Sequence, residues 1–180
     1  YPLSHIFGSA CTYESRFTAT DDDTGTAAAS VNVIIVGNNH PNRPHGYWKQ
    51  QFRSYVVGNG PSDFSVATLG CYLNVAAYMS RVFSEQSAAA TLAQAYAVLD
   101  TGPPKPIQQL FDVQLLAAWL NFANGAIEYN RLVDTNNDRI ADTPFLAAMV
   151  AAESVRLDPS STLQQLDRMK RIVESWTNLP

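Results

Sequence analysis

Oxygen-bearing side chains alternate along one short stretch of this sequence. Asp134, Asn136 and Asp138 are spaced two residues apart, and Asp142 follows shortly before an expected helix start. Acceptors at alternating positions of a loop can surround one hard cation, and calcium takes six to eight oxygen ligands at about 2.3–2.6 Å. The spacing therefore predicts a calcium site whose ligands are Asp134, Asn136, Asp138, a backbone carbonyl of Ile140 or Arg139, Asp142 and water.

Counted with Asp134 as position 1, the stretch resembles an EF-hand calcium loop. It is closer to the loop of a dockerin or a thrombospondin type 3 repeat with one residue deleted. Arg139 stands where the EF-hand has the glycine of its sharp turn, and Phe145 stands where it has a bidentate glutamate. The resemblance implies an affinity of order 10⁻⁴–10⁻³ M, typical of extracellular modules.

A structural explanation accounts for the same residues without a metal. Asp142 can cap the helix that Pro144 opens, since a carboxylate is favoured at a helix N-terminus. Asp134, Asn136 and Asp138 can form turns in which each side chain accepts a hydrogen bond from the backbone two residues on. The sequence leaves both interpretations open, and calcium is the cofactor that we expect.

Signals for catalysis are weak. The chain has no Gly-x-Ser-x-Gly motif and no glycine-rich phosphate loop. Glu85, Glu128, Glu153 and Glu174 are dispersed, and we expect each to be a solvated charge. A pair of glycosidase carboxylates is recognised by its separation in space, so a hydrolase acting on an extracellular polymer stays an alternative.

Composition restricts the class of protein. A chain of 180 residues with 46% hydrophobic and 16% charged residues is typical of a folded protein with one sizeable domain. The net charge of -4, with scattered basic residues, argues against nucleic acid as a partner. The apolar run 31–36 is too short to span a membrane.

The two cysteines, Cys11 and Cys71, are sixty residues apart and belong to no Cys-x-x-Cys motif. They are either one disulfide or two buried thiols. An exported protein favours the disulfide, which would stabilise the fold by roughly 3–4 kcal/mol, whereas an intracellular location favours thiols.

Residues 1–37 have the pattern of a β-hairpin. Positions 13–20 alternate, 21–25 form an acidic turn ending in glycine, and 27–36 end in β-branched residues. The Asp-rich turn and the closing Val31-Asn-Val33 resemble the last two strands of a polycystic-kidney-disease (PKD) repeat, an extracellular β-sandwich. An isolated hairpin is marginally stable, so we expect it to pack on another element.

After the hairpin, prolines and glycines predict an irregular linker over residues 38–62. From residue 63 the apolar period becomes helical and predicts an all-α domain over 63–180 that contains the calcium loop 134–142. The five expected helices begin near Ser62 or Asp63, at Ser87, at Asp112, at Pro144 and at a Ser161–Gln164 capping box. The predicted fold is therefore mainly α, with an N-terminal hairpin of β-sandwich type.

Two further motifs resemble a widespread module of secreted, often bacterial, proteins. They are Gly46-Tyr47-Trp48-Lys49 and Leu120-Asn-Phe-Ala-Asn-Gly-Ala126, in that order. The resemblance implies an exported multidomain context but supplies no reaction. Tyr47 and Trp48 are either a hydrophobic clamp over the helices or a platform on which a sugar stacks.

These observations favour a secreted or cell-surface protein. We expect a non-catalytic structural or adhesive module, stabilised by calcium, within a larger exported protein. A calcium-dependent module that binds a protein or glycan, similar to a dockerin, is the first alternative, and the extracellular hydrolase is the second.

Overall fold

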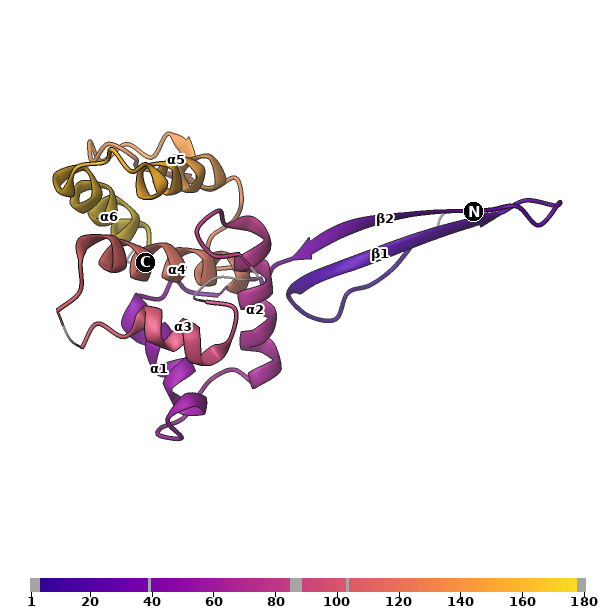
Figure 1. The fold of residues 1–180 in the computed structure, drawn as a ribbon, viewed down its shortest axis with the longest axis horizontal. Helices are drawn as coiled ribbons and strands as arrows, with labels where there is room; N and C mark the ends of the chain where they lie inside the picture. Colours follow the sequence, from indigo (N-terminus) through magenta and orange to yellow (C-terminus); the bar gives the residue numbers. More distant parts are fainter. Residues whose placement is uncertain (1–3, 39, 85–88, 103, 178–180) are drawn as a thin grey trace.

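The computed structural model describes residues 4–38, 40–84, 89–102 and 104–177. In this part of the chain, a helical body carries a two-stranded arm at its N-terminal side (Figure 1). The elements are β1 Cys11–Thr20, β2 Thr26–Ile35, α1 His45–Val56, α2 Val66–Met79, α3 Leu92–Leu99, α4 Ile107–Asn124, β3 Leu132–Val133, β4 Thr143–Pro144, α5 Phe145–Leu157 and α6 Leu163–Thr177.

Helix α4 is the centre of the helical body. Every residue from 113 to 124 is buried, and the helix contacts each of the other five helices. A helix that is apolar on all sides must be covered on all sides, and α4 carries leucine, alanine and aromatic residues around its whole circumference. It ends at Gly125, whose φ of 80° is the left-handed conformation that the Asn124-Gly125 pair predicts for a C-cap.

Helix α1 lies within the segment that we expected to be a linker. Its core face is formed by Trp48 and Phe52, four residues apart and both fully buried, with Gln51 beside them. Pro44 occupies the N-cap, where a missing N–H costs nothing. The prolines before the helix therefore mark its start, and the described residues contain six helices where five were expected.

Four helix starts differ from the sequence prediction. Helix α4 begins at Ile107, five residues before the expected Asp112. Ser65, not Ser62 or Asp63, caps α2 by accepting a hydrogen bond from Thr68 N. The N-terminal capping box of α3 is formed by Thr91 and Gln94, and the expected start at Ser87 lies outside the described residues. A Thr162–Gln165 pair makes the reciprocal bonds at α6 that were expected of Ser161 and Gln164.

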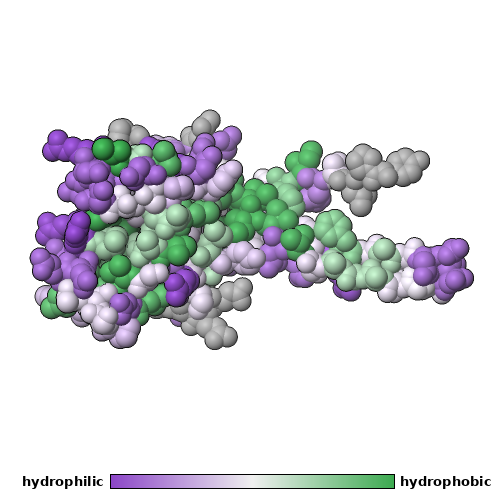
Figure 2. Space-filling view, turned by 90° about the horizontal axis from the view of Figure 1, so that it is seen from above, coloured by the Kyte–Doolittle hydropathy of each residue, from purple (hydrophilic) through white to green (hydrophobic). Residues whose placement is uncertain are grey.

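The hairpin prediction is confirmed, but within the described residues its sheet has two strands and is not a sandwich. Strands β1 and β2 pair antiparallel, with Cys11 opposite Ile35 and Thr20 opposite Thr26. The arm projects into solvent, and only its base rests on the body (Figure 1). Figure 2 shows hydrophobic residues along the arm and hydrophilic residues at its tip.

Two attachments join the arm to the body. The Cys11–Cys71 disulfide confirms that the cysteines are bonded and links the start of β1 to α2. Beyond β2, Gly37 N donates to Ala123 O at 2.9 Å, next to Gly125. A methyl group added at Gly37 or at Gly125 would overlap the backbone of the other segment, so both positions require glycine.

Within the residues that the structure describes, no helix combines the length and the hydrophobicity needed to cross a membrane.

Candidate functional site

The acidic loop 134–142 lies between α4 and α5 and is closed by a short ladder. Val133 pairs with Thr143 across its base, and Leu132 pairs with Pro144. Phe145 N also donates to Arg131 O at 2.8 Å, which joins the start of α5 to the segment before the loop. The ends of the loop are therefore held together by the backbone, whatever its side chains bind.

Inside the loop, the predicted ligands accept backbone hydrogen bonds. Asp134 Oδ1 accepts from Asn136 N at 3.0 Å and from Asn137 N at 2.6 Å, while Asp134 Oδ2 accepts from Arg139 N at 2.7 Å. Asn136 Oδ1 accepts from Asp138 N, and Asp138 Oδ1 accepts from Ile140 N. This is the set of turns that the metal-free interpretation predicts.

The backbone of the loop is left-handed at two residues. Asn137 has a φ of 68° and Arg139 a φ of 70°. Arg139 occupies the position at which an EF-hand loop has its glycine. A non-glycine residue here takes up the conformation for which glycine is suited, so the missing glycine does not prevent the sharp turn.

The hydrogen bonds leave room for a cation. A carboxylate or amide oxygen has two lone pairs. Asp134 Oδ1 uses both, but Asp134 Oδ2, Asn136 Oδ1 and the two oxygens of Asp138 each accept one hydrogen bond. Four oxygens from three side chains thus keep one acceptor site each, and calcium would need carbonyls and water to complete its shell.

Asp142 and Ile140 lie differently from the predicted ligand set. Asp142 Oδ1 accepts from Thr143 Oγ1 at 2.9 Å, and the N-cap of α5 is Pro144 without a side-chain cap, so the capping role predicted for Asp142 is wrong. The side chain of Ile140 is 62% exposed. Neither observation tests the carbonyl of Ile140 or the carboxylate of Asp142 as a ligand, and the backbone-bonded part of the loop is formed by Asp134, Asn136 and Asp138.

The electrostatics of Asp134 favour its ionised form. Desolvation acts to raise the pKa of this carboxyl, but backbone N–H groups of Arg139, Asn136 and Asn137 act against it and hold the pKa below its ordinary value. Asp134 is thus charged over the whole physiological range of pH. Among the described residues, no group of three or more His, Cys, Asp and Glu side chains could hold a metal, and the third acceptor here is the amide of Asn136.

The loop borders a shallow groove on α6. Asn136 and Asn137 line one side, and Asp167, Arg168 and Arg171 line the other, around a volume of about 460 Å³. Arg171 Nε forms an ion pair with Asp167 at 2.9 Å. The groove places arginine side chains next to the acidic turn, where they can meet an anionic group of a ligand.

The Tyr47–Trp48 pair belongs to the core more than to the surface. Trp48 is fully buried, stacks on Phe64 at a centroid distance of 5.7 Å and has no face exposed to a sugar. Tyr47 is partly exposed, donates to Asp63 Oδ2 at 2.6 Å and lies under the guanidinium of Arg43. Of the two interpretations, the burial of Trp48 favours the hydrophobic clamp over the sugar-stacking platform.

The two sequence motifs meet through Asn121. Its Oδ1 accepts from Arg43 N at 2.9 Å and from Trp48 Nε1 at 3.4 Å, and its Nδ2 donates to Arg43 O at 2.8 Å. Asn124 Oδ1 accepts from Tyr72 OH at 3.0 Å. Asn121 of the second motif thus satisfies the backbone of Arg43 just before α1 and contacts Trp48 of the first motif, so packing joins the two motifs.

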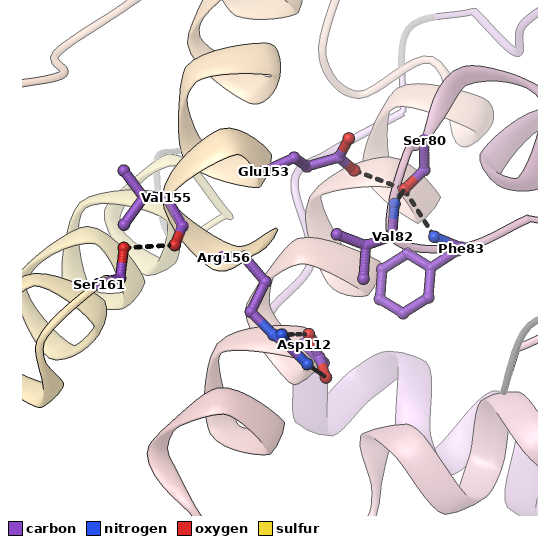
Figure 3. A network of polar contacts seen from close by, with 8 residues as sticks. All are labelled: Ser80, Val82, Phe83, Asp112, Glu153, Val155, Arg156 and Ser161. Atoms are coloured by element: carbon purple, nitrogen blue, oxygen red, sulfur yellow. Dashed lines mark hydrogen bonds and ion pairs between the residues drawn. The ribbon is translucent and has the colours of Figure 1, made fainter. Parts of the chain in front are cut away.

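Sequence reasoning missed one buried carboxylate. Glu153 is 1% exposed, and it accepts a hydrogen bond from Ser80 Oγ (Figure 3). It also accepts from Arg81 N and Trp119 Nε1. The expectation that it is a solvated charge is wrong; the signal was its place on an otherwise apolar face of α5, beside Met149 and Ala152. Glu128 is exposed, as expected, and Glu85 lies outside the described residues.

Neighbouring contacts explain the role of Glu153. Ser80 Oγ also accepts from Val82 N and Phe83 N, so the chain after α2 turns around one hydroxyl (Figure 3). Close by, Arg156 of α5 forms a two-bond ion pair with Asp112 of α4, at 2.7 and 2.9 Å. These polar bonds connect α2, α4 and α5 and are structural.

Comparisons with protein-family models, with curated proteins and with solved structures found no match for this chain.

Proposed function

We propose that this chain is an extracellular, non-catalytic structural or adhesive module, and that one calcium ion in the loop 134–142 stabilises its helical body. The observation that carries the proposal is the turn itself. Left-handed Asn137 and Arg139 gather oxygens of Asp134, Asn136 and Asp138, and four of these oxygens keep an acceptor site. Oxygen ligands of this kind suit calcium.

The proposed extracellular location is supported by the disulfide and by the weak affinity expected of the calcium site. The Cys11–Cys71 disulfide suits an oxidising environment, and extracellular fluid supplies enough calcium for a weak site. The resemblances of residues 1–37 to the end of a PKD repeat and of the two motifs to a secreted module agree with this location. They are part of the proposal.

Thermal unfolding with calcium and with chelator tests the metal site. For an affinity of 10⁻⁴–10⁻³ M, calcium at about 10 mM should stabilise the fold by roughly 1.4–2.7 kcal/mol. For a protein of this size the melting temperature should then rise by about 3–10 °C. Magnesium should do less, since it prefers water-rich octahedral sites.

Matched variants connect the effect to the loop. Asp134→Ala and Asp138→Ala should each abolish the calcium-dependent rise, whereas Asp22→Ala, in the exposed hairpin turn, should retain it. An identical melting temperature with calcium and with chelator would refute the calcium site. So would a rise that persists in both loop variants.

A calcium-dependent binding module is the second candidate, and the groove beside the loop favours it. Asn136 and Asn137 belong to both the loop and the groove, so an ion that orders the loop would also shape this surface. Binding to a glycan array, with calcium and then with chelator, tests this function. Arg168→Glu should weaken the binding of any anionic glycan that the array detects, and it should leave the calcium-dependent melting shift unchanged.

A further inference from the structure

Strand β1 has an outer edge that no other strand covers. In the described part of the chain, β1 is paired with β2 alone. Residues 4–10 lie beside this edge without pairing to it: the rings of Phe7 and Tyr13 have centroids 4.7 Å apart, and the Tyr13 hydroxyl donates to Ser9 O. Ser4, His5 and Phe7 line a hollow together with residues 13–17, so a second strand at this edge would displace them. An uncovered strand edge is a template for pairing with another strand.

The hydrogen bonds of the hairpin turn show which backbone N–H and C=O groups of β1 face away from β2. Asp21 N donates to Gly25 O at 2.9 Å, so this pair is a hydrogen-bonded one. Hydrogen-bonded and non-hydrogen-bonded pairs alternate along an antiparallel ladder. Tyr13, Ser15 and Phe17 therefore bond to β2, and the backbone groups of the even-numbered residues face the open edge.

The side chains of β1 are arranged symmetrically about Ser15. Thr12 and Thr18 lie three residues away on either side, Tyr13 and Phe17 two residues away, and Glu14 and Arg16 next to it. Read in opposite directions, the strand presents the same sequence of hydroxyl, aromatic and charged groups, with the two charges exchanged. Such a strand is complementary to a second, antiparallel copy of itself.

We propose that two copies of this chain pair antiparallel along their β1 edges, with Ser15 opposite Ser15 of the second copy. This register places Glu14 opposite Arg16 of the second copy, and Arg16 opposite its Glu14. It also keeps the even-numbered backbone groups opposite one another, as hydrogen bonding requires. The result is a continuous four-stranded sheet with a two-fold axis at Ser15.

Burial and charge both favour this arrangement over its competitors. Phe17 is 54% exposed, and in the dimer it would lie opposite Tyr13, an aromatic pair that stabilises a sheet. Parallel pairing in register would place each charge next to its own copy, which is unfavourable. Strand β2 carries no charged residue between Thr26 and Ile35, so its outer edge has no complementary charges to fix a register.

Charge exchange tests the register. We expect the wild-type chain to sediment as a monomer–dimer mixture across the micromolar to millimolar range. Glu14→Arg or Arg16→Glu creates two like-charge pairs per dimer and should raise the dissociation constant about tenfold or more. The double variant Glu14→Arg/Arg16→Glu restores both pairs and should return to the wild-type value.

Cysteine placement tests the axis. Ser15→Cys should form a disulfide between two copies, because non-hydrogen-bonded partners have Cα atoms about 4.5 Å apart. Val31→Cys, opposite Ser15 in the hairpin, should not, since three strand spacings of about 4.8 Å would separate it from its copy. Peptide mass analysis checks that Cys11 and Cys71 stay bonded to each other.

Any of three results would overturn the proposal: a wild-type chain that is monomeric at every concentration, a double variant as weak as the single ones, or a Val31→Cys crosslink that forms more readily than that of Ser15→Cys. The last would indicate that two arms stack face to face. The inference is independent of calcium, because chelation should leave this equilibrium unchanged.

Discussion

The indole Nε1 of Trp176 donates a hydrogen bond of 2.8 Å to the backbone carbonyl of Asp134. Trp176 is 1% exposed in α6, and Asp134 is the first residue of the acidic loop. The carbonyl adjoining the candidate metal site is thus held by the last helix. Order in the loop and docking of α6 are thereby linked through one bond.

Replacing Trp176 by phenylalanine should weaken both. The variant loses this hydrogen bond and part of a buried ring, so we expect the free energy of unfolding to fall by about 1–3 kcal/mol. The calcium-dependent melting shift should shrink as well. Trp48→Phe is the control, since Trp48 is also buried but bonds to Asn121 and not to the loop. Equal calcium shifts in the two variants would contradict the link.

Arg139→Gly should stabilise the protein. Arg139 is exposed and left-handed, with a φ of 70°, a conformation that costs a non-glycine residue about 1–2 kcal/mol. Glycine removes this cost but gains freedom in the unfolded chain, so we expect a net stabilisation of about 1 kcal/mol. Asn137→Gly should gain less, because asparagine tolerates this conformation. Chemical denaturation measures both, and a destabilised Arg139→Gly would show that the guanidinium contributes to the fold.

Glu153→Gln should destabilise the helical body. The carboxylate accepts from three donors, whereas an amide group has one accepting oxygen and an NH₂ that would oppose either Arg81 N or Trp119 Nε1. Leaving a buried donor unsatisfied costs about 1–3 kcal/mol. Glu128→Gln, on the surface, should change the unfolding free energy by less than about 0.5 kcal/mol. Urea denaturation of both variants measures this difference. Equal midpoints would contradict a stabilising role for the buried carboxylate of Glu153.

Tyr47 should make stability fall at high pH. Burial, and then its hydrogen bond to Asp63, raise the pKa of the phenol from its ordinary value of 10.0 to about 12. The stability that neutral Tyr47 contributes is therefore complete below pH 10 and is lost as the pH rises through about 12. The difference in unfolding free energy between wild type and Tyr47→Phe should be constant below pH 10 and decrease above it. Absorbance titration near 295 nm should show one tyrosine that ionises near pH 12 in wild type and is missing from Tyr47→Phe. If the tyrosine lost in the variant instead ionises near pH 10, the burial argument is contradicted.

Short-range patterns predicted the arm and most of the helical body well. Alternation at residues 13–20 and the acidic turn define a hairpin, and Gly125 ends α4 as the Asn-Gly pair indicates. Capping residues were less certain, because Ser161 and Thr162 are neighbours of the same type, and Gln164 and Gln165 are identical. Only tertiary packing decides which pair makes the box.

Long-range pairing could not be obtained in this way. The only buried hydrophobic residues of helix α1 are Trp48 and Phe52, and the helix forms because it packs against α3 and α4, which lie far along the chain. The three donors of Glu153 come from residues 34 to 73 positions away in the chain. Spacing indicated the candidate ligands of the loop, but the left-handed conformation of Arg139 became visible only in three dimensions.

The two attachments of the arm have a mechanical consequence. One strand is joined to α2 by a covalent bond at Cys11, and the other continues through Gly37 onto the end of α4. A ribbon held at both strands cannot swivel about either one. A force applied at the distant turn would therefore be transmitted to α2 and α4 together. The arm would carry this tension into the helical body as a rigid element and not as a flexible linker.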